Sequence, residues 1–102
     1  MEGLNTENVI SIFKENMDTI EKFHVNKLGL FGSFARDEQA SGSDIDVLVE
    51  FENGFETFDN YMDLKFYIED LFSLEVDLVI LGSIKPALKS SILRSTKYAK
   101  GA

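Results

Sequence analysis

The sequence predicts an α+β domain: a small mixed β-sheet of three or more strands with helices covering one of its faces. Helix-like and strand-like segments alternate along 102 residues. This length allows one domain, spanning residues 1–102, with a single core. Two of the strand-like segments are apolar on one face and carry acids on the other. Because a sheet covered on both faces would be apolar throughout, we expect one face to stay open.

The first half of the chain predicts a helix, a strand and a turn. Apolar residues recur at helical spacing after polar capping residues, which predicts a helix over residues 6–23. Residues 25–31 have the alternation of a strand, and Gly32-Ser33 ends it. Only a short helix can begin at residues 34–36, before a polar loop.

The second half predicts two further strands and two helices. Residues 44–51 and 74–81 alternate between apolar and polar side chains, as half-buried strands do. Between them, the apolar spacing of residues 58–72 indicates a helix. A last helix is expected from Ser83 to about Tyr98, because serine is a favourable helix cap.

Composition excludes several classes of protein. The chain has no Cys and one His, so we expect neither a thiolate zinc site nor a Cys nucleophile. No apolar run approaches the roughly 20 residues of a membrane span, and the first residues do not resemble a signal peptide. A cytoplasmic protein without membrane association is therefore expected. The net charge of −8 argues against direct nucleic-acid binding.

The charge is unevenly distributed along the chain. All 18 acidic residues lie within the first 81 positions, whereas residues 82–102 carry five basic residues and no acid. Such a basic segment can attract an acidic partner or phosphate groups. Alternatively, it reflects only the preference of the last turns of a helix for Lys and Arg.

Two aspartates open the second predicted strand. Asp44 and Asp46 are two residues apart, so both carboxylates lie on one face, and Asp is uncommon in strands. Paired carboxylates suit a hard divalent cation such as Mg²⁺. If residues 74–81 form the neighbouring strand, Asp77 projects from the same face. Three carboxylates can hold two ions about 3.5–4 Å apart for phosphoryl or nucleotidyl transfer. The alternative is an acidic, solvent-facing surface without a ligand.

Gly32-Ser33 is a candidate phosphate-binding turn. Glycine permits close approach of the backbone, and a helix start after it would offer free N–H groups to phosphate oxygens. The Ser33 hydroxyl can add a contact, and Arg36 follows three residues later. A Gly-Ser pair alone is more often a plain loop. Its position between a strand and the acidic strand favours the phosphate-binding interpretation.

The complete motif resembles the signature of the DNA polymerase β-like nucleotidyltransferase superfamily. The matching segment is LFGSFARDEQASGSDIDVLVEF, residues 30–51, and the chain is most similar to the minimal nucleotidyltransferases (MNT). This resemblance implies that Asp44 and Asp46 bind metal, while Asp77 completes the site and acts as base toward the incoming hydroxyl. It also assigns the triphosphate to Gly32 and Ser33.

The sequence departs from residues common in that superfamily at three positions, Phe34, Asp37 and Ser95. The last of these stands roughly where a Glu often precedes a terminal Tyr, here Tyr98.

The resemblance also implies a function and a partner. Many MNT proteins pair with a helical HEPN toxin, an RNase, and act as its antitoxin. Some of them transfer AMP from ATP to a tyrosine of the toxin, so the resemblance implies a Mg²⁺-dependent protein adenylyltransferase. Two alternatives remain open, namely a binding module that neutralises its partner by occlusion and a nucleotidyltransferase acting on small molecules of the antibiotic type. A homo-oligomer is compatible with each.

Overall fold

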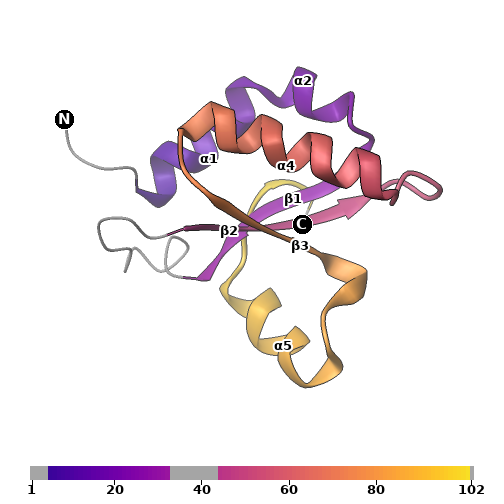
Figure 1. Ribbon diagram of the computed structural model, residues 1–102. Helices are drawn as coiled ribbons and strands as arrows, with labels where there is room; N and C mark the ends of the chain where they lie inside the picture. Colours follow the sequence, from indigo (N-terminus) through magenta and orange to yellow (C-terminus); the bar gives the residue numbers. More distant parts are fainter. Residues whose placement is uncertain (1–4, 33–43, 102) are drawn as a thin grey trace.

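The computed structural model describes residues 5–32 and 44–101, which form a four-stranded sheet with helices on its two sides (Figure 1). The strand order is β3-β2-β1-β4, with β2 and β3 parallel and β1 antiparallel to both of its neighbours. The predicted mixed sheet and α+β class are therefore confirmed. In chain order the elements are α1 (Thr6–Glu15), α2 (Met17–Glu21), β1 (Val25–Phe31), β2 (Ile45–Phe51), α4 (Phe58–Phe72), β3 (Val76–Ile80), the 3₁₀ turn η1 (Leu81–Ser83), α5 (Pro86–Ser95) and β4 (Lys97–Lys100).

The core lies between the sheet and the layer formed by α1, α2 and α4 (Figure 1). Alternation along β2 explains which face is buried, because every second side chain from Ile45 to Phe51 points into this layer. Each fully buried aliphatic side chain contributes on the order of 1.5–3 kcal/mol to folding. The buried cluster consists of Val9, Phe13, Ile20, Val25, Leu28, Leu30, Ile45, Val47, Val49, Phe51, Leu64, Ile68, Phe72, Val76 and Leu78.

The first helix is shorter than predicted, because Asn16 interrupts it. Asn16 caps α1 by donating its side-chain amide to the carbonyl of Ile12 at 2.9 Å, and α2 starts at the next residue. Apolar spacing continues across this break, so it could not reveal the interruption. By contrast, α4 spans the predicted residues 58–72, with the Thr57 hydroxyl accepting a hydrogen bond from the Asn60 N–H at 3.2 Å.

The prediction of a helix reaching Tyr98 is wrong, because α5 ends at Ser95 and the next residues form β4. This strand pairs with β1, with Lys97 opposite Leu30 and Tyr98 opposite Gly29. Gly29 makes room for the chain entering β4: a Cβ there would lie 2.6 Å from the Thr96 methyl carbon. The β4 strand forms through this pairing, a tertiary contact that its own short and charged sequence does not indicate.

Side chains of α4 cover the free edge of β3. The Tyr61 hydroxyl donates to the carbonyl of Leu78 at 2.6 Å, and the Glu69 carboxylate accepts from the Val76 N–H at 3.1 Å. Lys65 also donates to Glu69, at 2.8 Å. The hydrogen bond from Lys65, and then that from Val76, lower the pKa of Glu69 below its ordinary value. Occupying edge groups in this way blocks pairing with other strands.

Because of this arrangement, the stability of the fold should fall at acid pH. Since the pKa of Glu69 is lowered in the folded state, its ionised form stabilises the fold, and this contribution is lost as pH falls below about 4.5. We expect Glu69→Gln to lower the melting temperature at neutral pH, with a deficit that narrows toward about pH 3. Glu15→Gln, at the exposed end of α1, is the control. An equal deficit at both pH values would contradict this account.

The helix α5 lies on the opposite side of the sheet from α1, α2 and α4 (Figure 1). The expected open face is thus only partly open, although no residue of α5 is itself buried. Alternation along β2 places the Leu48 side chain on the same side of the sheet as α5, and Leu48 is 1% exposed. Across residues 5–32 and 44–101, no helix is long and apolar enough to span a membrane.

Candidate functional site

The candidate site lies at the edge of the sheet where β2 and β3 begin and β1 ends. Asp46 pairs in register with Asp77 on β3 and with Phe31 on β1. Paired residues of adjacent strands share a face, and their backbones lie about 4.8 Å apart across the sheet. Asp46 is half-buried and Asp77 is exposed. The strands β2 and β3 are therefore neighbours, as the predicted placement of Asp77 beside the aspartate pair requires.

Gly32 joins this group from the end of β1. Its φ of +72° lies in the left-handed region, which favours glycine. A Cβ at Gly32 would collide with the carboxylate of Asp46, so the backbone of Gly32 lies directly against that side chain. Glycine is required here both by the backbone conformation and by the space that Asp46 occupies.

The third aspartate, Asp44, is exposed and lies just before β2. The backbone there is held to the start of β3 by the Ile45 N–H, which donates to the carbonyl of Glu75 at 3.1 Å. Nevertheless, no three His, Cys, Asp or Glu side chains within residues 5–32 and 44–101 come close enough to hold a metal ion. The structure thus sets Asp46 beside Asp77 without gathering all three carboxylates into one cluster.

Several predicted positions fall outside the part of the chain that the structure describes. Ser33 and Arg36, the other candidate nucleotide-binding residues, are among them, as are Phe34, Asp37 and the short helix expected at residues 34–36. Ser95 is described, and its hydroxyl donates to the carbonyl of Ile92 at 3.0 Å within α5.

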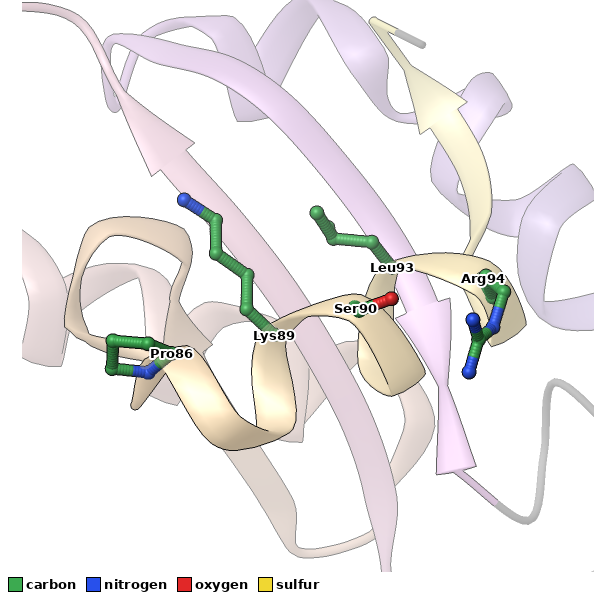
Figure 2. A pocket seen from close by; sticks show the side chains of 5 residues that line it. All are labelled: Pro86, Lys89, Ser90, Leu93 and Arg94. Carbon is green, nitrogen blue, oxygen red and sulfur yellow. The ribbon is translucent and has the colours of Figure 1, made fainter.

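A groove on α5 was not predicted from the sequence. It has a volume of about 590 Å³ and is lined by Pro86, Lys89, Ser90, Leu93 and Arg94 (Figure 2). The run of basic residues after position 82 was the available signal. The predicted longer helix did not indicate where the groove lies, because it did not include a strand after α5 that pairs with β1.

Comparison with known proteins identifies the class to which this fold and site belong. The model of the nucleotidyltransferase domain matches residues 10–99, so the chain belongs to the nucleotidyltransferase domain family. The match includes both strands that carry the aspartates and the turn at Gly32.

Individual relatives narrow this assignment. Protein adenylyltransferase MntA of Thermococcus cleftensis is 35% identical over 92 residues, which are 90% of each chain. A protein of Methanocaldococcus jannaschii, described provisionally as a protein adenylyltransferase, is 49% identical over 81 residues, 76% of this chain and 80% of that one. Within the nucleotidyltransferase family, the chain therefore belongs with the MntA-type proteins.

Solved structures agree with this assignment at the level of the fold. A structure described provisionally as a minimal nucleotidyltransferase superposes with a TM-score of 0.80 at 28% identity, covering 95% of this chain and 98% of the other. A chain from a toxin–antitoxin complex with AMP-PNP superposes with a TM-score of 0.69 at 24% identity, covering 97% and 75% respectively. The second likeness concerns the fold alone.

Proposed function

We propose that this protein transfers AMP from ATP to a hydroxyl of a partner protein, a tyrosine of a HEPN-type toxin, and thereby acts as its antitoxin. The observation that carries the proposal is the contact of the Gly32 backbone with Asp46, in register with Asp77. This arrangement occurs in a chain that is 35% identical to an MntA protein adenylyltransferase over 90% of both chains. The choice of partner follows from the resemblance to MNT proteins that pair with HEPN toxins, and the chain also has the fold of a chain from a toxin–antitoxin complex.

The chemistry of the donors suits magnesium, although the three carboxylates do not form one cluster within residues 5–32 and 44–101. Asp44, Asp46 and Asp77 offer only carboxylate oxygens, the ligands that Mg²⁺ prefers, and nucleotide phosphates would complete the coordination. We propose that these three residues hold two Mg²⁺ ions. When bound, the ions would neutralise charge on the transferred phosphoryl group and on the leaving pyrophosphate.

The residues of the chain hold the nucleotide and the acceptor in line. We propose that the Gly32 backbone, the Ser33 hydroxyl and Arg36 hold the triphosphate, which leaves the α-phosphorus facing the aspartates. Asp77 takes the proton of the acceptor hydroxyl, whose oxygen forms a bond to the α-phosphorus. The bond from that phosphorus to the bridging oxygen of the β-phosphate breaks, and pyrophosphate leaves. Such positioning can supply much of the rate enhancement.

Exposure of the site favours a macromolecular acceptor. Asp44 and Asp77 are exposed, so in the described part of the chain the reacting groups are open to water on one side. A transfer that depends on orientation benefits from a shielded site. A partner protein that docks over this edge would exclude water and bring its own hydroxyl to the α-phosphorus.

The proposal is tested by incubating the chain with ATP, Mg²⁺ and its helical partner. We expect the intact mass of the partner to rise by whole adenylyl groups, and peptide mapping to locate them on a hydroxyl residue. A partner that is fully neutralised without any mass change would instead support neutralisation by occlusion. Rapid modification of a small molecule by the chain alone would favour the antibiotic-type activity.

A further inference from the structure

The cationic side chains of the helix α5 are exposed to solvent. None of its residues is buried, and Lys89 and Arg94 line the groove of about 590 Å³ together with Pro86, Ser90 and Leu93. We call this the α5 groove. In Figure 2, Lys89 and Leu93 extend from the same side of the helix, while Arg94 extends near its C-terminal end. Both cations are exposed and thus available to a ligand.

The connection to β4 shows where the chain that follows α5 joins the sheet relative to the aspartates. The strand β4 begins at Lys97, which pairs with Leu30, and the following residue of β1, Phe31, pairs with Asp46. Lys97, two residues after the end of α5, therefore lies about two strand spacings, roughly 10 Å, from Asp46. The helix α5 itself lies on the side of the sheet opposite the helical core layer (Figure 1).

Charge indicates what kind of ligand the α5 groove takes. Every charged residue from 82 to 102 is basic, whereas the neighbouring site edge carries Asp44, Asp46 and Asp77. A nucleotide triphosphate placed beside those carboxylates would be repelled unless cations lie close to its other end. Lys89 and Arg94 can supply two such charges, and Ser90 can supply a hydroxyl donor.

We propose that the α5 groove binds the β- and γ-phosphates of the nucleotide, and holds the pyrophosphate before it departs. This inference rests on the function proposed above and extends it, because it adds Lys89 and Arg94 to the residues that position the substrate. Leu93 and Pro86 line the groove beside the two cationic side chains. An acidic segment of a partner protein is the competing occupant, and the experiment below separates the two.

The test measures ATP affinity of the full chain without a partner, by titration calorimetry in the presence of Mg²⁺. We expect Lys89→Ala and Arg94→Ala each to weaken ATP binding about tenfold, as loss of a charge-assisted contact does. Tripolyphosphate should compete with ATP for the native chain and should compete poorly for the double variant. The double variant Lys14→Ala with Lys22→Ala, which removes the same charge from exposed positions on α1 and after α2, should bind ATP normally.

The outcomes distinguish this inference from the proposed function. If the native chain and the Lys89/Arg94 double variant bind ATP equally, the inference is wrong while nucleotide binding stands. If that variant binds ATP normally but associates more slowly with the partner, the groove belongs to the partner instead. Failure of the native chain to bind ATP would overturn both. Because α5 buries no residue, the melting temperature of the double variant should match that of the native chain, which excludes unfolding as the cause.

Discussion

Replacing Gly32 with alanine should greatly slow nucleotidyl transfer while leaving the chain folded. The added Cβ would meet the carboxylate of Asp46, and the backbone at Gly32 has a φ of +72°. Relief of the collision must move either the turn or Asp46, and displacement of a positioned group by about 1 Å can cost on the order of 100-fold in rate. We expect the rate of AMP transfer to fall by about 100-fold or more. The affinity for ATP should fall as well.

Gly54 provides a matched control for the backbone effect. It also has a positive φ, of +91°, but a Cβ there would meet no atom within 4 Å. Alanine at either position should lower the free energy of unfolding by about 1–2 kcal/mol, the cost of a left-handed conformation. Only Gly32→Ala should lose transfer. If Gly54→Ala lost transfer equally, the effect would come from stability and the close approach to Asp46 would be irrelevant.

Neutralising Asp77 and Asp46 should separate catalysis from nucleotide binding. As the proposed base, Asp77 should be needed for turnover, so Asp77→Asn should slow transfer by about 10²–10⁴-fold. ATP affinity should change little, because Asp44 and Asp46 remain to bind the metal-bound nucleotide. Asp46→Asn should reduce both the transfer rate and the affinity for Mg-ATP. Rates of adenylylation together with calorimetric affinities measure the two effects independently.

The exposed acid Asp70 on α4 is the control for charge alone. Asp70→Asn should leave both quantities unchanged. Removal of the Asp77 charge should also relieve repulsion with its register partner, Asp46, since like charges directly opposite each other destabilise a sheet. The free Asp77→Asn protein should therefore melt no lower than the native chain. A variant that keeps full turnover would exclude Asp77 as the base.

Most of the sheet could be predicted because its strands have a clear alternation. The strand at residues 25–31 has the predicted bounds, and those at 44–51 and 74–81 differ from β2 and β3 only at their ends. The β4 strand could not be predicted, because its formation depends on pairing with β1 and on the space left by Gly29. The break at Asn16 likewise depends on a side-chain cap, which apolar spacing does not report.

The site followed from the sequence to a similar extent. Alternation placed Asp46 on the acid-bearing face, and the topology of β2 and β3 set Asp77 beside it. The contact between Gly32 and Asp46 is a property of three-dimensional packing that no local pattern contains. The return of the chain from α5 to the sheet depends on β4, so the error in this element concealed where the α5 groove lies. The roles assigned to Ser33 and Arg36 stay predictions.

The most direct test of the proposed reaction is the fate of labelled phosphorus in ATP. The chain should be incubated with Mg²⁺, its helical partner and ATP labelled at either the α- or the γ-phosphate. An adenylyltransferase should transfer the α-label stably to the partner and release the γ-label in pyrophosphate, and Asp77→Asn should prevent both. Transfer of the γ-label to the partner would indicate phosphorylation. Neutralisation of the partner with neither label attached would contradict the account.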